Sequence, residues 1–200
     1  MRVSVGTPVP EYTWMAFVDG ENFTIEAQKI AEARGLQLIE GQYHKKDCFV
    51  WLPGVHATAN IGGHLALLQS YAIRAYYYTS LVGDEKALDS VKQSLWQLGF
   101  SPQVFKKDTK QRKAKGVDIA LTKDMLSHAF LGHYEVAILI AGDGDYVPLV
   151  EEVKRLGKLV YLCFFEGQSL SPALKLASDR YRDPTADFIE GWEHESRKHG

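Results

Sequence analysis

Four aspartates in this 200-residue chain follow an apolar run or stand at the start of a predicted helix. Asp19 follows WMAFV, Asp143 and Asp145 follow VAILIA, and Asp118 lies in KGVDIALTKDM. Carboxylates gathered at one site repel one another, and in water-poor surroundings each tends to take up a proton. A hard divalent cation removes that penalty, and Mg²⁺ or Mn²⁺ prefers oxygen ligands. Held by several carboxylates, such ions can activate a water and neutralise charge on a phosphodiester.

Each of these residues also has a purely structural interpretation. An aspartate after a strand is often a turn former or a helix cap, and Asp145 is well placed to cap a helix beginning at Tyr146. Asp118 suits the positive end of a helix dipole. Asn22 is a candidate cap for the helix after the first strand. Asp124 lies about 120° around the helix from Asp118 and would reach the same site only through a bend.

Apolar runs alternate along the chain with segments of helical spacing. Strands are expected at residues 14–18, 73–79, 103–105, 136–141 and 159–164, and helices between 22 and 35 and at 64–71, 86–98, 117–130 and 146–156. Apolar strands alternating with helices imply a parallel sheet covered on both faces. We therefore expect an α/β fold with a doubly wound, mainly parallel five-stranded sheet. In such sheets ligands bind beyond the carboxyl ends of the strands, where the aspartates stand.

The length suits one domain, which we expect to span residues 1–200. Residues 36–64 fit the alternation least well and are interpreted as a hairpin-like insertion or a long loop. Phe49 and Trp51 within them suit hairpin packing or, as an alternative, base stacking. A tail that ends in a frayed helix is expected from about residue 183, with Trp192 among polar residues.

The composition excludes several classes of protein. With 46% hydrophobic and 24% charged residues, the chain is neither disordered, collagen-like nor a coiled coil. Its longest apolar run, Leu159–Phe165, is far shorter than the roughly 20 residues of a membrane span. The two cysteines form no CxxC pair, and the N-terminal residues lack the apolar core of a secretory signal. A cytoplasmic location without membrane contact is expected.

The net charge is only −2, so a charge-based function must come from local clustering. Residues 106–116, KKDTKQRKAKG, form the main basic run and lead directly into Asp118. Such a run can hold a phosphate backbone without reading its sequence, and the candidate phosphate contacts are Lys110, Arg112, Lys113 and Lys115. The alternative is a solvated loop.

The segments FVDGENF, KGVDIALTKDM, LIAGDGDYVPLV and GKLVYLC together resemble the NYN domain, in particular its LabA-like branch, within the PIN-like nuclease superfamily. The resemblance covers residues 14–24, 73–80 and 116–190. It implies a doubly wound sheet with an acidic pocket for Mg²⁺ or Mn²⁺ and a ribonuclease function.

The resemblance also implies roles for individual residues. Those it marks as catalytic and metal-binding are Asp19, Asp118, Asp143 and Asp145, with Asp124 as a further metal ligand. Asn22 matches the polar residue beside the first aspartate and is expected to position the substrate. The familiar SGDSDF form has Ala141 in place of its serine and Tyr146 in place of its phenylalanine. Neither change removes a carboxylate.

The leading hypothesis is therefore a metal-dependent ribonuclease acting on single-stranded RNA. One alternative is a non-catalytic RNA-binding or regulatory module that keeps the fold and the acids. Another is a small phosphate-ester hydrolase that uses the same carboxylates. A homo-oligomer formed through the tyrosine-rich strand and residues 36–64 is a further hypothesis.

Overall fold

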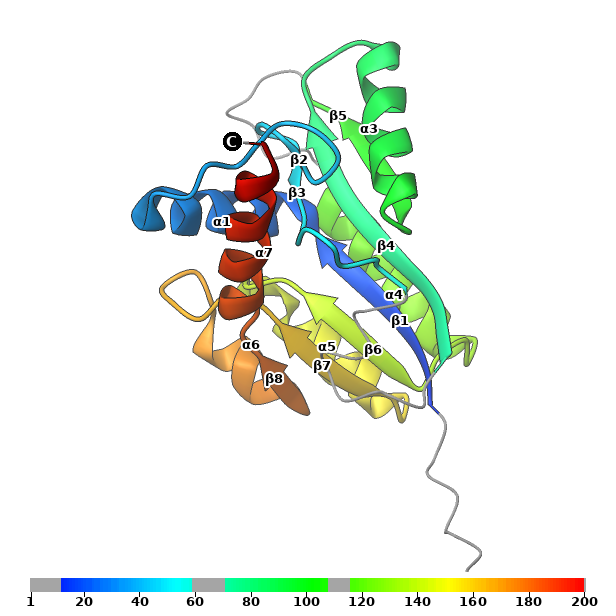
Figure 1. The fold of residues 1–200 in the computed structure, drawn as a ribbon. Coiled ribbons are helices and arrows are strands. Elements are labelled where there is room, and N and C mark those ends of the chain that lie inside the picture. Colours follow the sequence, from blue (N-terminus) through cyan, green and yellow to red (C-terminus); the bar gives the residue numbers. More distant parts are fainter. Residues whose placement is uncertain (1–11, 59–70, 108–115, 200) are drawn as a thin grey trace, which may run out of the picture.

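The computed structural model describes residues 12–58, 71–107 and 116–199. Its centre is a six-stranded sheet in the order β5-β4-β1-β6-β7-β8, in which every neighbouring pair is parallel (Figure 1). These strands are β1 (Thr13–Asp19), β4 (Tyr71–Leu81), β5 (Ser101–Lys106), β6 (Val136–Ile140), β7 (Leu159–Cys163) and β8 (Arg180–Arg182). A separate antiparallel hairpin consists of β2 (His44–Lys45) and β3 (Phe49–Val50).

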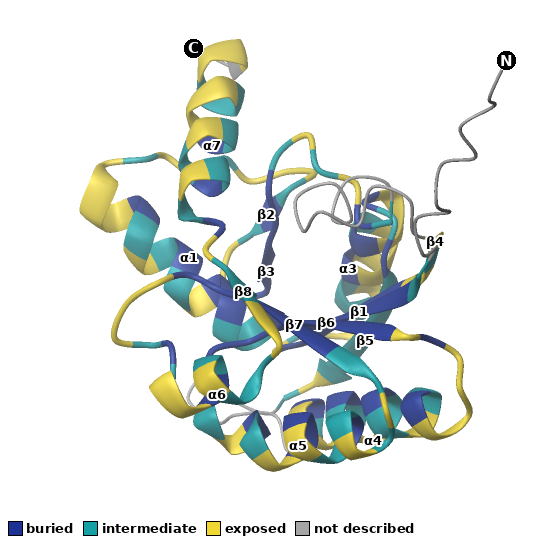
Figure 2. Ribbon diagram, turned by 90° about the horizontal axis from the view of Figure 1, so that it is seen from below, coloured by how far each residue is buried: buried dark blue, intermediate teal, exposed yellow. Residues whose placement is uncertain are grey.

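Helices cover both faces of the sheet. They are α1 (Gly20–Arg34), α3 (Glu85–Gln97), α4 (Val117–Phe130), α5 (Val147–Arg155), α6 (Pro172–Ala177) and α7 (Thr185–His199), with a 3₁₀ turn η1 (Gly144–Tyr146) before α5. Figure 2 shows α4 and α5 on one side of the sheet, and α1, α7 and the hairpin on the other. The predicted doubly wound α/β fold is confirmed. Within the described residues, every helix is too short or too polar to span a bilayer.

Strand β4 places tyrosine side chains on both faces of the sheet. Side chains alternate along a strand, so consecutive tyrosines point in opposite directions. The hydroxyl of Tyr78 donates to Asp124 of α4 at 3.0 Å, whereas that of Tyr77 donates to the carbonyl of Val50 in the hairpin, also at 3.0 Å. Strands β1 and β6 are apolar on both faces because both faces are buried, which explains why they are visible in the sequence as continuous apolar runs.

The order of the strands creates a switch point between β1 and β6. From β1 the chain builds β4 and β5 on one side, then returns to build β6, β7 and β8 on the other. The segments that leave β1 and β6 therefore run in opposite directions, which opens a crevice at the carboxyl ends of these strands. Asp19 ends β1, and Asp143 follows shortly after β6, so both aspartates stand at this crevice.

Several boundaries differ from the sequence-based expectation. A sixth strand, β8, was not expected because three residues at a sheet edge carry no periodic apolar signal. Strand β4 begins at Tyr71, so the helix expected at 64–71 does not include that residue; its remaining positions lie outside the described residues. The helix expected at 146–156 begins one residue later as α5, after the η1 turn.

The two segments that fitted the pattern least are packed onto the core. Part of the 36–64 segment forms the β2–β3 hairpin, and its Phe49 and Trp51 are buried as hairpin packing predicted. The C-terminal segment is the helix α7 rather than a frayed tail, and it buries Phe188 and Trp192. The Trp192 ring meets His44 of the hairpin edge-on, at a centroid distance of 6.2 Å. Two aromatic side chains four residues apart were too sparse a stripe to predict this packing.

Replacing Trp192 by alanine tests whether α7 is anchored on the core. The Trp192 side chain is 1% exposed and that of Trp96 on α3 is 71% exposed. We expect Trp192→Ala to lower the free energy of unfolding by about 3–5 kcal/mol, because it leaves a cavity. The matched control Trp96→Ala should change it by less than about 0.5 kcal/mol. Urea unfolding measures both, and equal losses would contradict the packing.

Candidate active site

A hollow of about 350 Å³ lies where α4 begins and the η1 turn follows β6. Its lining residues are Asp118, Ile119, Thr122, Lys123, Asp143, Asp145 and Tyr146. Three of the four aspartates that the sequence marks as catalytic therefore face one cavity. They come from α4 and η1, which precede and follow β6 in the chain, so the start of α4 lies beside the carboxyl end of β6.

The fourth, Asp19, lies behind the hollow and is buried. Its Oδ1 accepts a hydrogen bond from the Asn22 backbone N–H at 3.1 Å, and its Oδ2 accepts one from the Tyr146 hydroxyl at 3.0 Å. Helix α1 begins at Gly20, so Asp19 is its N-cap and the expected cap at Asn22 was wrong. The helix begins this early because the carboxylate of Asp19 satisfies one of its free N–H groups.

Tyr146 joins Asp19 to the hollow. Its buried hydroxyl lies 3.0 Å from Asp19 Oδ2 and 3.1 Å from Asp118 Oδ1. Burial, with the two negative charges beside it, raises the pKa of this hydroxyl, so it remains a hydrogen-bond donor. A phenol has only one hydrogen, so it cannot satisfy both carboxylates fully at the same time. The sequence showed tyrosine in place of phenylalanine here but gave no reason to assign it this contact.

The site is electrostatically strained at Asp19. The pKa of its carboxyl is raised from 3.8 to about 6. Burial is the largest cause, and the charges of Asp118 and Glu21 act in the same direction, while the hydrogen bonds from Asn22 and Tyr146 oppose them. This is the repulsion and desolvation expected of gathered carboxylates.

Asn22 connects the segments that follow β1 and β6. Its side-chain Oδ1 accepts a hydrogen bond from the Gly142 N–H at 2.7 Å. Gly142 in turn accepts one from the Ser171 N–H at 2.8 Å. A Cβ at Gly142 would lie 2.3 Å from the Phe164 ring and 2.5 Å from the carbonyl oxygen of Ser169, so this close packing requires glycine.

Asp143 and Asp145 share the η1 turn. Oδ1 of Asp143 accepts the Asp145 backbone N–H at 3.1 Å, so Asp143 caps the turn. The cap expected of Asp145 was wrong, because α5 has Tyr146 at its N-cap and no side-chain cap hydrogen bond. Asp145 itself is exposed, whereas Asp143 is half-buried. The side chain of Asp145 thus meets solvent at the rim of the hollow.

Asp124 does not join the other four aspartates. It lies six residues along α4 from Asp118, which displaces it by about 9 Å along the axis as well as around it. Its Oδ2 accepts the Tyr78 hydroxyl at 3.0 Å, and its Oδ1 pairs with the Lys123 ammonium at 3.2 Å. The bend that would bring it into the hollow is absent from α4, a continuous helix over residues 117–130.

The basic run is only partly described. The candidate phosphate contacts Lys110, Arg112, Lys113 and Lys115 lie outside the described residues. Lys107, just before them, donates from its ammonium to Glu21 at 3.1 Å and from its N–H to the Leu81 carbonyl at 2.9 Å. Glu21 also accepts from the hydroxyl of buried Ser80. The described start of the run is therefore fixed beside the β1–α1 turn that carries Asp19.

The lining of the hollow suits a hard cation in its chemistry. Its charged oxygen donors are carboxylates, and no histidine or cysteine lines it. Over residues 12–58, 71–107 and 116–199, however, no three Asp, Glu, His or Cys side chains are grouped closely enough to hold an ion together. Side chains alone therefore do not complete a coordination sphere in this arrangement.

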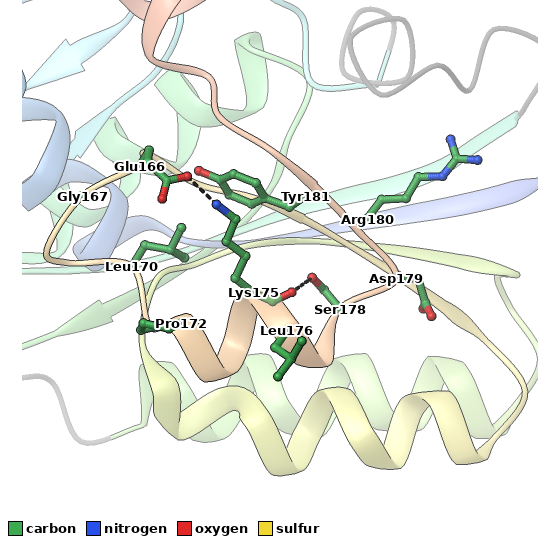
Figure 3. A pocket seen from close by; sticks show the side chains of 10 residues that line it. All are labelled: Glu166, Gly167, Leu170, Pro172, Lys175, Leu176, Ser178, Asp179, Arg180 and Tyr181. Atoms are coloured by element: carbon green, nitrogen blue, oxygen red, sulfur yellow. Dashed lines mark hydrogen bonds and ion pairs between the residues drawn. The ribbon is translucent and has the colours of Figure 1, made fainter.

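A second, larger hollow of about 660 Å³ lies between α6, β8 and the segment after β7 (Figure 3). Its charges neutralise one another. Glu166 pairs with Lys175 at 2.6 Å, the Lys175 ammonium lies 4.1 Å from the centre of the Tyr181 ring, and Asp179 pairs with Lys154 at 3.1 Å. Figure 3 shows Lys175 reaching Glu166 beside the Tyr181 ring. With its acids paired, this hollow is a weaker candidate for metal or phosphate chemistry.

A parallel, doubly wound sheet with an acidic hollow at its switch point places the chain in a class of α/β proteins that bind ligands at strand ends. Residues 14–185 match the family model of the NYN domain, and the chain belongs to this family, which is part of the PIN-like nuclease superfamily. The crystal structure of a protein of unknown function from Vibrio parahaemolyticus is similar, with a TM-score of 0.59 and 20% identity, covering 94% of this chain and 99% of that one. That likeness concerns the fold. None of the curated proteins matches the chain significantly.

The strain at Asp19 predicts a pH dependence of stability in metal-free protein. Because the folded pKa of about 6 exceeds the ordinary 3.8, the folded state binds the proton more tightly. Stability should therefore fall as the pH rises from about 4 to about 6, by about 2 kcal/mol. Asp19→Asn should remove this loss, because an amide still accepts the Asn22 N–H but carries no charge.

Urea unfolding in EDTA across this pH range measures the effect. The matched control is Asp84→Asn, since Asp84 is also an N-cap, accepting the Ala87 N–H at 2.9 Å, but is exposed. It should leave the slope between pH 4 and 6 unchanged. If Asp19→Asn keeps the wild-type slope of stability against pH, the buried charge of Asp19 is not the cause of that slope.

Proposed function

We propose that this protein is a metal-dependent ribonuclease that hydrolyses phosphodiester bonds of single-stranded RNA. The observation that carries the proposal is the convergence of Asp118, Asp143 and Asp145 on one hollow at the switch point, with Asp19 joined to them through Tyr146. Membership of the NYN family, which is typically nuclease, supports the same reaction class. The basic run, whose described start is fixed beside the β1–α1 turn, supports a polyanionic substrate.

Mg²⁺ or Mn²⁺ fits the carboxylate oxygens of this site. The proposed oxygen ligands are Asp19, Asp118 and Asp143, with water completing the coordination. In the arrangement described, no three acidic, histidine or cysteine side chains of the described residues are grouped closely enough to hold an ion, so these carboxylates would have to move closer together to bind it. When bound, the cation supplies charge neutralisation at the scissile phosphate and lowers the pKa of a water. It would also offset the burial of Asp19 and the repulsion from Asp118 and Glu21, which together raise the pKa of Asp19.

The remaining residues would act through hydrogen bonds. Asp145, exposed at the rim, would accept a hydrogen bond from the attacking water and orient it. Tyr146 would keep Asp19 and Asp118 aligned, and Asn22 would hold the Gly142 turn in place. The cations proposed to hold the RNA backbone are Lys110, Arg112, Lys113 and Lys115.

Cleavage of a labelled single-stranded RNA tests the proposal. The purified protein is assayed with Mn²⁺, with Mg²⁺ and with EDTA. We expect cleavage only with metal, and a fall in rate of at least about 100-fold in Asp143→Asn, because a ligand is lost. The control Asp89→Asn removes an exposed carboxylate on α3 and should keep the wild-type rate.

Three results would contradict the proposal in distinct ways. Cleavage that survives both EDTA and Asp143→Asn would place the chemistry elsewhere. Salt-sensitive RNA binding without cleavage would identify a binding module that keeps the acids. Hydrolysis of mononucleotide esters without cleavage of RNA would identify a small phosphate-ester hydrolase.

A further inference from the structure

Lys123 contributes a positive charge to the acidic hollow. Among the residues that line the hollow in the described part of the chain, the other charged side chains are the three aspartates. The Lys123 side chain is 70% exposed, so its ammonium can meet a ligand that arrives from solvent. A cation on the rim of an otherwise anionic cavity suits a ligand that carries negative charge beyond the part held in the cavity.

The ammonium of Lys123 pairs with a carboxylate that is linked to the core of the protein. Its partner Asp124 holds it at 3.2 Å through Oδ1 and accepts the Tyr78 hydroxyl at 3.0 Å through Oδ2. Tyr78 is completely buried in β4, so the line of contacts from Tyr78 through Asp124 to Lys123 starts at a fixed point.

An apolar side chain accompanies Lys123 on α4. Ile119 is four residues earlier, which places both on the same helix face. It lines the hollow and is 73% exposed, an unusual position for an isoleucine. An apolar contact followed by a cation, both beside the carboxylates, matches a nucleotide unit, whose base has an apolar face and whose phosphate is anionic.

We propose that Lys123 binds a backbone phosphate next to the scissile one, and that Asp124 is a positioning residue for its ammonium rather than a metal ligand. The inference rests on the proposed ribonuclease function and narrows the substrate to a polymer. A simple phosphodiester has no neighbouring phosphate for Lys123 to hold. The contribution of Lys123 to binding should therefore be measurable with an RNA oligomer and absent with a simple phosphodiester.

The first experiment compares Lys123→Ala with wild type on a short labelled oligouridylate and on bis(p-nitrophenyl) phosphate, both with Mn²⁺. We expect KM for the oligouridylate to rise about tenfold with kcat within about twofold, because one charge-assisted contact is lost. KM for bis(p-nitrophenyl) phosphate should not change. The control Lys92→Ala removes a lysine of an equivalent pair, 3.2 Å from Asp89 on α3, and should leave both KM values unchanged. Lys123→Arg, which keeps the charge, should restore most of the affinity.

The second experiment separates positioning from metal binding at Asp124. In Asp124→Asn the amide oxygen can still accept the Tyr78 hydroxyl, so the helix stays anchored. Titration of Mn²⁺ by electron paramagnetic resonance should give wild-type affinity, while KM for the oligouridylate rises about threefold. A loss of Mn²⁺ affinity of about tenfold or more would make Asp124 a ligand and overturn its assignment.

The outcomes distinguish this inference from the function on which it rests. If wild type cleaves RNA but Lys123→Ala keeps its KM, or loses affinity equally for both substrates, the phosphate contact is wrong and the ribonuclease stands. If wild type binds the oligouridylate without cleaving it, the salt dependence of binding tests the contact between Lys123 and the phosphate. The slope of log K against log salt should then fall by about 0.7 in Lys123→Ala and not in Lys92→Ala. An unchanged slope overturns the contact, and wild type that neither cleaves nor binds overturns both.

Discussion

The burial of the Asp19 carboxylate, with the charge of Asp118 beside it, is the constraint on which the site depends. Both carboxylates reach the same hydroxyl, that of Tyr146, and one of them is buried. The donors that surround Asp19 are neutral, so they reduce the cost of its charge without cancelling it, and its pKa stays raised. The same arrangement that lowers the stability of the metal-free protein therefore favours a bound cation.

The carboxylates meet because the backbone can approach closely at two glycines. A Cβ at Gly20 would lie 2.1 Å from the Tyr77 ring and 2.6 Å from the carbonyl oxygen of Tyr78, and Gly142 is equally confined. Gly20 lets α1 begin directly at the end of β1, and Gly142 lies in the short segment between β6 and η1. The acids are thus placed by rigid strands on either side of the switch point, although they stand in turns.

The sequence predicted the elements best where a strand is buried on both faces or where a helix has regular apolar spacing. The bounds of β1, β6 and α4 were predicted to within one residue. The edge of the sheet at which the aspartates lie was also predicted. Contacts across the fold could not be predicted, because they depend on which side chains meet after folding. The Tyr146 bridge, the Tyr78–Asp124–Lys123 line and the burial of Trp192 are of this kind. The cap that Asp143 makes on η1 was missed because the two acids on either side of Gly144 fit the same local pattern.

The hydrogen bond from Gly142 to Asn22 has a consequence for how the pocket keeps its form. It crosses the seam between the two halves of the sheet, where the chain leaves in opposite directions. The side-chain amide of Asn22 neither gains nor loses a proton at physiological pH. Its hydrogen bond with Gly142 therefore persists while the carboxyl group of Asp19 changes its charge. The shape of the cleft and its charge are thereby governed by separate side chains. Substitutions that change the pKa of the acidic residues can therefore leave the hydrogen bond between the segments after β1 and β6 intact.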